Sequence, residues 1–151
     1  MDFKTAVTTN FSKYATFTGR ARRSEYWFFV LFNVLVSIAL GVVSLFLAIP
    51  FAGLAAGLGA GILGAGAGFL VSYFGIFVLL SGLYGLAVII PTVAVTVRRL
   101  HDLNATGWFV LIFFLLSFIP ILGFFVAIGQ IVWYAQKGTG GENKYGPDPV
   151  V

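Results

Sequence analysis

A nearly uncharged run restricts this chain more than any other feature of its sequence. Within residues 26–136 the only formally charged side chains are those of Arg98, Arg99 and Asp102, which share one pentapeptide with the single histidine, His101. Charged residues make up 9% of the chain, against roughly 25% in soluble domains. So few charges cannot cover a soluble globule, and we therefore expect lipid to be the solvent for most of the chain.

The apolar runs predict an all-α integral membrane protein: a small bundle of three transmembrane helices, with a fourth left open, and an N-terminal interfacial amphipathic helix. The length suits a single membrane domain over residues 1–151. The expected segments are a cytoplasmic or interfacial amphipathic segment (1–25), span 1 (27–49), a Gly/Ala-rich segment (51–68), span 2 (75–97), a polar turn (98–107), span 3 (108–134) and a polar tail (136–151).

Span 1 is long enough to cross a bilayer. As a helix, Trp27 to Ile49 would measure ~35 Å, which exceeds the hydrocarbon core. Tyr26 and Trp27 stand at its start, where amphipathic rings suit the headgroup level, and Pro50 is expected to end it. The run is also longer than the apolar region of a cleaved signal peptide, which has about 7–15 residues.

The segment before span 1 has a helical pattern. Apolar residues recur at Phe3, Val7, Phe11 and Tyr14, and these steps place them on one face of a helix. The polar and basic residues around them predict a short amphipathic helix in the membrane interface.

The Gly/Ala-rich segment 51–68 allows two interpretations. Its small residues four positions apart, such as Gly53, Gly57 and Gly61, are typical of closely packed membrane helices. Each glycine also weakens a helix by roughly 1 kcal/mol relative to alanine. The segment is therefore either an extra helix or an apolar loop or re-entrant segment.

Charge positions predict the topology. Basic residues before span 1 and the pair Arg98 and Arg99 after span 2 should both be cytoplasmic by the positive-inside rule, with two crossings between them. Three spans with an external C-terminus is then the simple count. Pro120 and Gly123 interrupt span 3, however, and a hairpin broken at Pro120 would return the tail to the cytoplasm.

The charged pentapeptide is the first place where chemistry could occur. It is either a turn at the membrane surface, with arginines facing lipid phosphates and Asp102 capping the next helix, or a polar site for a ligand, lipid headgroup or partner. With one histidine and no cysteine in the chain, a metal hydrolase or thiol nucleophile is not supported, and no serine has a partner base other than His101. We expect no metal site, no cofactor and no catalytic residue.

A second polar group precedes span 1. Glu25 could pair with Arg98 or Arg99 across two helix ends, so that the basic residues form a rim suited to anionic lipid or phosphate. The candidate residues of this polar cap are Arg20, Arg22, Arg23, Glu25, Arg98, Arg99, His101 and Asp102. The candidate interface aromatic and motif residues are Tyr26, Trp27, Trp108, Asn143, Tyr145 and Asp148.

Three strings carry a family resemblance: GRARRSEYWFF near the N-terminus, VRRLHDLNATGWF in the middle and GTGGENKYGPDP near the end. In this order they resemble the small bacterial inner-membrane proteins of the YhaH type, catalogued as domain of unknown function 805 (DUF805), over roughly Phe11 to Pro149. The resemblance implies a compact helical protein of the cytoplasmic membrane without an assigned activity. The chain departs from that pattern in its longer Gly/Ala segment and in Asn104-Ala105-Thr106, where Gly or Ser is common.

These observations lead to a functional expectation. We expect a non-enzymatic, multi-pass inner-membrane protein with a cytoplasmic N-terminus, whose basic cytoplasmic cap holds lipid headgroups, anionic ones in particular, or a protein partner. The alternative is a small transporter or channel subunit that acts as a homo-oligomer through its small-residue segment. Nothing in the charge pattern follows a nucleic-acid groove, so nucleic acid is not an expected partner.

Overall fold

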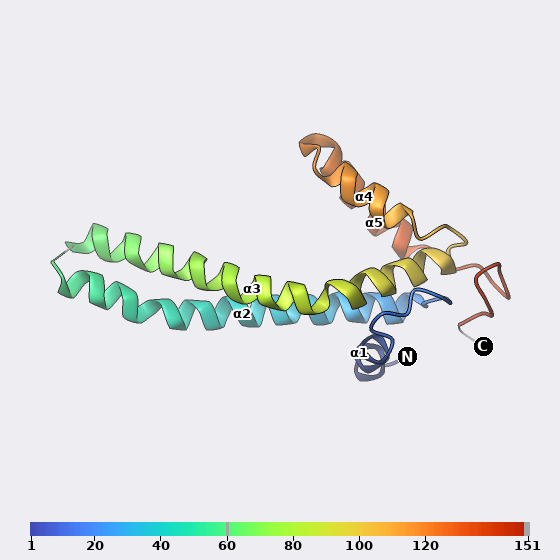
Figure 1. Ribbon diagram of the computed structural model, residues 1–151, viewed down its shortest axis with the longest axis horizontal. Helices are drawn as coiled ribbons and strands as arrows, with labels where there is room; N and C mark the ends of the chain where they lie inside the picture. Colours follow the sequence, from blue (N-terminus) through green and yellow to red (C-terminus); the bar gives the residue numbers. More distant parts are fainter. Residues whose placement is uncertain (60, 150–151) are drawn as a thin grey trace. The chain divides into compact units, whose positions relative to one another are not determined.

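The computed structural model describes residues 1–59 and 61–149. In that part of the chain the regular structure is helical, apart from one isolated bridge between Asn143 and Gly146, which agrees with the expected all-helical class. The described residues form two compact units, Met1–Leu31 with the chain from Ile89 onward, and Phe32–Val88. The helices of Figure 1 are, in chain order, α1 (Phe3–Ser12), α2 (Arg23–Gly57), α3 (Gly61–Asp102), α4 (Phe109–Ser117) and α5 (Pro120–Ala135).

Helix α1 is amphipathic, as its sequence predicts. Asp2 caps it by accepting a hydrogen bond from the backbone N–H of Thr5 (3.3 Å), and hydrogen bonding from Thr5 lowers the pKa of Asp2. Its inner face buries Ala6 and Asn10. Aromatic rings attach the helix to the start of α2: Phe3 meets Phe28, and Phe11 meets Phe29, both edge to face.

Helix α2 does not end at Pro50. It continues through this proline to Gly57, so the expectation that Pro50 terminates the helix is wrong. Proline removes one backbone donor, but in an apolar environment every other peptide group still needs an intrahelical partner, and the helix therefore continues. At 35 and 42 residues, α2 and α3 would measure ~52 Å and ~63 Å.

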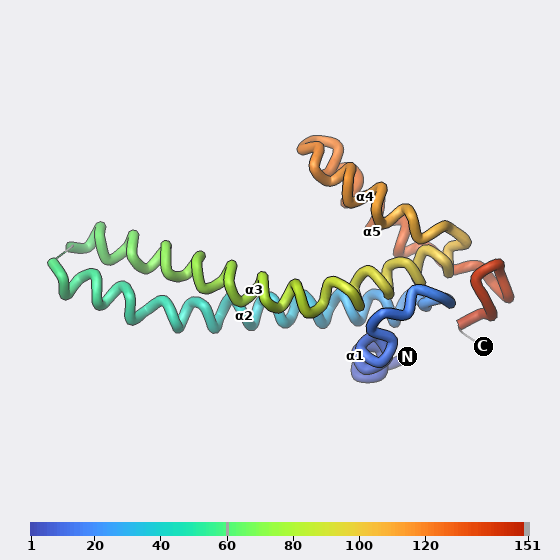
Figure 2. The backbone as a smooth tube through the Cα atoms, viewed as in Figure 1, coloured from blue at the N-terminus to red at the C-terminus, as the bar shows by residue number. Residues whose placement is uncertain are grey.

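The Gly/Ala-rich segment forms the ends of these two helices and the turn between them. Gly59 and Gly61 have φ angles of +79° and +64°, which suit glycine at a reversal of the chain. Beyond the turn, a Cβ added to Gly68 would lie 3.2 Å from Cβ of Ala55, so α3 approaches α2 closely there. Figure 2 traces this reversal, and residue 60 lies outside the described residues.

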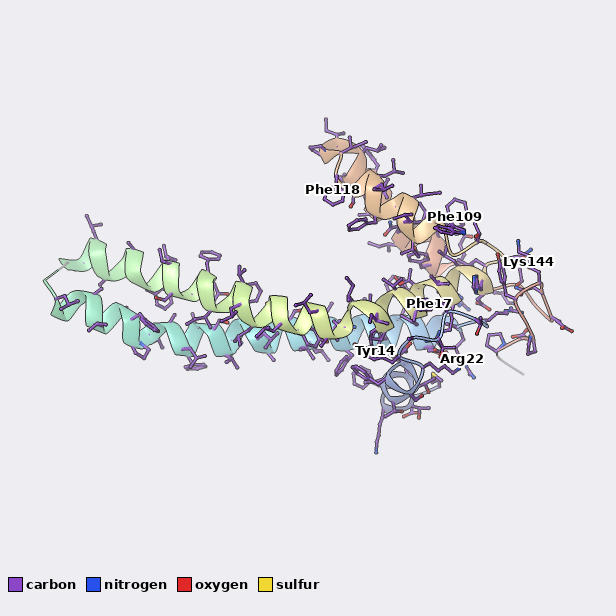
Figure 3. The ribbon with its side chains drawn as sticks, viewed as in Figure 1. Tyr14, Phe17, Arg22, Phe109, Phe118 and Lys144 are labelled. Carbon is purple, nitrogen blue, oxygen red and sulfur yellow. The ribbon has the colours of Figure 1, made fainter. Side chains whose placement is uncertain are left out.

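Within the unit Phe32–Val88, the exposure of side chains is the reverse of that in a soluble protein. Leucines and isoleucines face outward, among them Leu58 (78% exposed), Ile62 (92%) and Leu63 (90%), and side chains project outward all along the hairpin in Figure 3. Only 11% of the most apolar window is buried in either long helix, and mean hydropathy there is 2.6 for α2 and 2.3 for α3. Both helices are long and apolar enough to cross a membrane by length and composition.

One polar contact joins the two helices inside this apolar hairpin. The hydroxyl of Tyr84 donates a hydrogen bond to Oδ1 of Asn33 (2.8 Å). Such contacts between membrane helices contribute on average only about 0.6 kcal/mol, because the polar groups also find partners when the helices are apart.

Helix α3 also runs further than expected. It includes Pro91 and continues to Asp102, so the residues from Arg98 to Asp102 form its last turns rather than a polar turn. The turn itself begins at Leu103, and Asn104 adopts a left-handed conformation there (φ 58°). The helix holds the side chains of residues 98–102 in fixed directions, which a loop would not do.

The segment expected to form span 3 is divided into two helices. Helix α4 ends at Ser117, and α5 begins at Pro120, whose missing N–H is tolerated at the first position of a helix. The two helices pack side by side in antiparallel fashion, with the ring of Trp133 edge-on to Phe109 and Phe113. The hairpin alternative at Pro120 is therefore the arrangement present in the structure.

Candidate functional site

Asp102 is the centre of a buried polar cluster, which we define as Arg20, Glu25, Arg98, Arg99 and Asp102. One carboxylate oxygen of Asp102 accepts hydrogen bonds from Nε of Arg20 (3.0 Å) and lies 2.9 Å from its Nη2. The other oxygen accepts from Nη1 of Arg99. Asp102 is 3% exposed, and Arg20 and Arg99 are 7% and 0% exposed, so one carboxylate pairs with two guanidinium groups away from solvent, and the three groups together remain positively charged.

Arg20 also holds the C-terminal tail. Its Nη1 donates to the backbone carbonyls of Gly141 and Gly146, and its Nη2 donates to that of Thr139. The backbone N–H and the hydroxyl of Thr139 both donate to the carbonyl of Asp102, each at 2.9 Å. A guanidinium can bind several acceptors in one plane, which a lysine could not do.

Arg99, in the last turn of α3, binds the C-terminal end of α5. Its Nε and Nη2 donate to the carbonyl of Tyr134 (3.1 and 3.0 Å), and Nη2 also donates to that of Gln136. These carbonyls have no partner within their own helix, because the last four carbonyls of a helix lack one. A cation at this position also suits the negative end of the helix dipole. Arg99 therefore attaches the returning end of the α4–α5 hairpin to the end of α3.

Arg98 attaches the N-terminal segment. Its Nη1 donates to Oε1 of Glu25 (2.7 Å), one of the two pairings expected for Glu25, and its Nη2 donates to Oδ1 of Asn10 (2.9 Å). Arg98 is 1% exposed and Glu25 is 3% exposed. The backbone is joined at the same place, since the N–H of Ala21 donates to the carbonyl of Arg98 (2.9 Å).

His101 contacts both the segment before α2 and the C-terminal tail. Its Nδ1 lies 3.1 Å from the carbonyl of Gly19, which places the proton on Nδ1. Its ring stacks on Tyr145 of the tail, with centroids 3.9 Å apart and an interplanar angle of 7°. Asn143 completes the contact by donating to the carbonyl of His101 (3.0 Å). This histidine therefore fixes the tail to the end of α3.

A pocket of about 310 Å³ lies beside the polar cluster, and we call it the basic pocket. Its cations Arg22, Arg23 and Lys137 form no ion pair with a carboxylate among residues 1–59 and 61–149. Four cationic side chains and two carboxylates line it, so its balance is positive. The lining residues are Arg22, Arg23, Arg99, Asp102, Lys137, Gly138, Thr139, Gly140 and Asp148.

The structure separates the candidate residues into two groups. Arg20, Arg98 and Arg99 are buried on protein partners, so they do not face outward as part of a basic rim. Arg22 and Arg23 line the basic pocket without an ion pair among the described residues, and the buried pair Arg99 and Asp102 also contributes to its wall. The tail residues Asn143, Tyr145 and Asp148 lie at the same end of α3, where Asp148 accepts a hydrogen bond from the N–H of Gly141 (3.0 Å).

The aromatic candidates lie around this cluster. Tyr26 contacts the rings of Trp27 and Tyr134, at 5.3 and 5.1 Å between centroids, whereas Trp108 is 72% exposed. Sequence reasoning missed Asn10 and Lys137 as members of the site. A signal for Asn10 was its place one turn after Ala6 on the inner face of α1, but nothing local indicated that Lys137 would lie near Arg22 and Arg23.

Both carboxylates of the polar cluster are held by arginines, Glu25 by Arg98 and Asp102 by Arg20 and Arg99. Across residues 1–59 and 61–149 no group of three His, Cys, Asp or Glu side chains could hold a metal ion.

Loss of the central carboxylate should destabilise the protein strongly. In an Asp102→Asn variant, Arg20 and Arg99 would remain buried without a counter-charge, which costs about 3–5 kcal/mol for a broken buried ion pair. Thermal unfolding in detergent or nanodiscs should show a large fall in Tm. Glu142→Gln removes an exposed carboxylate from the same tail and should change the Tm little; equal effects of the two variants would contradict the role given to Asp102.

A glycine pair in the tail offers a second test of the cluster. A Cβ on Gly138 would overlap the carboxylate of Asp102, whereas a Cβ on Gly140 would meet nothing within 4 Å. We expect Gly138→Ala to displace the carboxylate and lower the Tm, and Gly140→Ala to leave it nearly unchanged. A Gly138→Ala variant as stable as Gly140→Ala would show that the tail does not pack on Asp102.

Comparisons with known proteins agree with the resemblance in the three strings. The family model described as "Protein of unknown function (DUF805)" matches residues 14–147. "Inner membrane protein YhaH" of Escherichia coli (strain K12) is 37% identical over 149 residues, covering 99% of this chain and 97% of that protein. "Inner membrane protein YhaI" of the same strain is 35% identical over 136 residues, covering 90% and 87%. No solved structure matches. The chain belongs to the DUF805 family, whose function is unknown.

Proposed function

We propose that this protein is a multi-pass protein of the bacterial inner membrane that binds the phosphate group of anionic lipids in the basic pocket, on the cytoplasmic side. This proposal rests on a difference between two sets of cations. The buried arginines of the polar cluster are occupied by protein acceptors, while Arg22, Arg23 and Lys137 line a cavity without a carboxylate partner among the described residues. Phosphate oxygens are suitable acceptors for these cations.

The membrane location has two supports. Two relatives that align over most of this chain are named inner membrane proteins, and α2 and α3 have the length and hydropathy of spanning helices. The cations of the basic pocket then define the cytoplasmic side by the positive-inside rule. Two crossings, by α2 and α3, return the chain to this side at Arg98.

We further propose that α4 and α5 form a re-entrant hairpin. Their lengths of 9 and 16 residues correspond to ~14 Å and ~24 Å, and both are shorter than the ~30 Å hydrocarbon core. The two ends of the hairpin meet at the end of α3, since Arg99 binds the carbonyl of Tyr134 and Thr139 binds that of Asp102. The tail is therefore on the cytoplasmic side in this proposal, rather than external as in a three-span topology.

A small-residue interface for an oligomeric transporter or channel receives less support. Part of the small-residue segment already serves the hairpin itself, because Gly68 packs against Ala55. A protein partner at the basic pocket would need to present phosphate or carboxylate groups to the same cations, and this alternative is an outcome of the lipid experiment below.

Topology can be tested by labelling, because the natural chain contains no cysteine. Single variants Leu58→Cys at the hairpin turn, Thr8→Cys in α1 and Glu142→Cys in the tail would each introduce one exposed thiol. In intact spheroplasts a membrane-impermeant maleimide should label Leu58→Cys alone. After permeabilisation all three should react, which serves as the control; labelling of Glu142→Cys in intact spheroplasts would reject the cytoplasmic tail.

Lipid binding can be tested by removing the unpaired cations. The triple variant Arg22→Gln, Arg23→Gln, Lys137→Gln should lose retention of phosphatidylglycerol over phosphatidylethanolamine in native mass spectrometry, by about a hundredfold at roughly 1 kcal/mol per cation. Lys4→Gln, Lys13→Gln, Lys144→Gln removes the same charge from exposed positions outside the pocket and should retain the preference. Equal retention by both triple variants would reject the basic pocket as the lipid site.

A further inference from the structure

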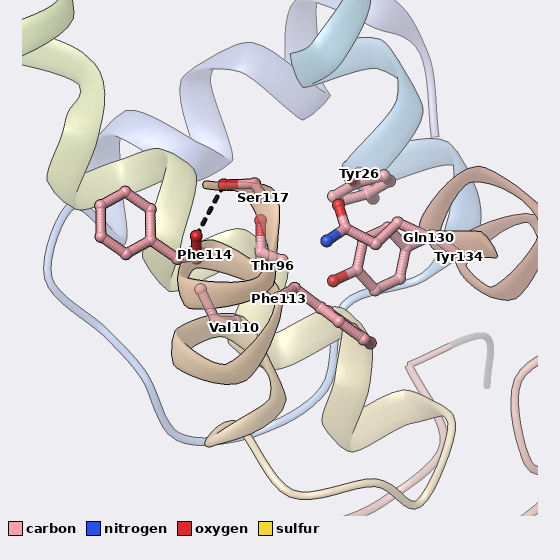
Figure 4. A pocket seen from close by; sticks show the side chains of 8 residues that line it. All are labelled: Tyr26, Thr96, Val110, Phe113, Phe114, Ser117, Gln130 and Tyr134. Carbon is pink, nitrogen blue, oxygen red and sulfur yellow. Dashed lines mark hydrogen bonds between the residues drawn. The ribbon is translucent and has the colours of Figure 1, made fainter. Parts of the chain in front are cut away.

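A second pocket lies in the same unit as the polar cluster. It has a volume of about 290 Å³, and no charged side chain lines it. We call it the hydroxyl pocket, because hydroxyl and amide groups alternate with apolar side chains on its walls (Figure 4). The lining residues are Tyr26, Thr96, Val110, Phe113, Phe114, Ser117, Gln130 and Tyr134.

Three polar groups of this pocket have no hydrogen-bond partner among the residues that the structure describes. Tyr134 is 4% exposed, yet among residues 1–59 and 61–149 nothing bonds to its hydroxyl, nor to the side chains of Tyr26 and Gln130. By contrast, Thr96 and Ser117 donate to carbonyls of their own helices, at 2.7 and 2.6 Å. Tyr26 and Gln130 are half-buried, so their polar groups, with the hydroxyl of Tyr134, are open to a ligand that supplies acceptors.

The unpaired groups also point to one place. In Figure 4 the amide of Gln130 and the hydroxyl of Tyr134 are directed toward the same space, and Thr96 and Ser117 lie across it. The rings of Tyr26 and Tyr134 lie 5.1 Å apart between centroids. Gln130 and Tyr134 of α5 therefore face a pocket that Tyr26 of α2 also lines and that Phe113 and Phe114 of α4 border.

The residues that line the hydroxyl pocket lie about one helical turn from residues that line the basic pocket. On α2, Tyr26 follows Arg23 by one helical turn; on α3, Thr96 precedes Arg99 by one turn; after α5, Lys137 comes three residues past Tyr134. One turn corresponds to about 5.4 Å. The two pockets also share a wall, because Arg99 of the basic pocket donates to the carbonyl of Tyr134 (3.1 Å).

We propose that the hydroxyl pocket binds the glycerol-ester region of a glycerophospholipid whose phosphate occupies the basic pocket. The hydroxyls of Tyr26 and Tyr134 and the amide of Gln130 donate to the ester carbonyls, and Phe113 and Phe114 contact the first part of an acyl chain. A glycerophospholipid carries its phosphate on one carbon of a single glycerol and its two ester groups on the other two carbons, which suits two pockets one helical turn apart. This inference rests on the proposed function, since it assigns the rest of the same ligand.

The chemistry distinguishes this ligand from other phosphate carriers. A free phosphate or an acidic protein segment would satisfy the cations of the basic pocket and leave the three donors unpaired. The absence of charge from the lining of the hydroxyl pocket suits a neutral ester, because a second charged group would be desolvated there without a counter-charge.

The test uses two forms of phosphatidylglycerol, one with ester-linked chains and one with ether-linked chains of equal length, which lacks the carbonyl acceptors. The full-length wild-type protein should retain the ester form about fivefold better in native mass spectrometry, as expected for one or two hydrogen bonds. The double variant Tyr26→Phe, Tyr134→Phe should lose this preference and retain the ether form as the wild type does. Tyr73→Phe, which removes a tyrosine hydroxyl elsewhere on α3, should keep it.

The outcomes separate the two proposals. Equal retention of both forms by the wild type, or an unchanged ester preference in Tyr26→Phe, Tyr134→Phe, would overturn the ester assignment and leave phosphate binding standing. If the triple glutamine variant of the basic pocket retains both forms fully, the proposed function fails first, and this inference fails with it.

Discussion

The buried carboxylate of Asp102 is the interaction on which the rest of this unit depends. It forms ion pairs with both Arg20 and Arg99, and these two arginines hold the C-terminal tail and the end of α5 through backbone carbonyls. Three chain segments far apart in sequence are thus joined through one anion. Breaking such a pair leaves an unpaired cation in a low dielectric, so the segments are held together or released together.

The molecule reverses the usual positions of apolar and charged residues. Its largest fully buried side chains include Arg98 and Arg99, while Ile62 and Leu63 are about nine-tenths exposed. This reversal is stable where lipid covers the apolar side chains and the charged ones find each other inside. Arginine suits the interior role because its planar group can satisfy several acceptors without losing its proton. The cations of the basic pocket that form no ion pair among the described residues are then available to a ligand.

How far the sequence predicts this structure depends on the range of each interaction. Hydropathy and spacing predict α1 and the long apolar helices, since these depend on neighbouring residues. They also indicate that Glu25 meets an arginine of the pair at 98 and 99. They misplace the end of α2 at Pro50 and assign Arg98 to a turn, because a proline signal that ends a soluble helix is overridden in an apolar setting. Local sequence does not predict that Lys137 lines the same pocket as Arg22 and Arg23, because this placement requires the α4–α5 hairpin to bring the chain back to the end of α3.

That return has its own local cause, and it is the counterpart of the arginine cluster. The chain reverses at Phe118 and Ile119, and the N–H of Gly123 donates to the carbonyl of Ile119 (2.6 Å) in the first turn of α5. A Cβ at Gly123 would lie 2.7 Å from the carbonyl oxygen of Ser117, so only glycine permits this tight reversal. Without it the carbonyl of Tyr134 could not reach Arg99, and the two pockets would lose the lining residues that α5 and the segment after it contribute. The tail can pack on Asp102 only if Gly123 permits the reversal between α4 and α5 and if the charged residues at the end of α3 bind the returning chain.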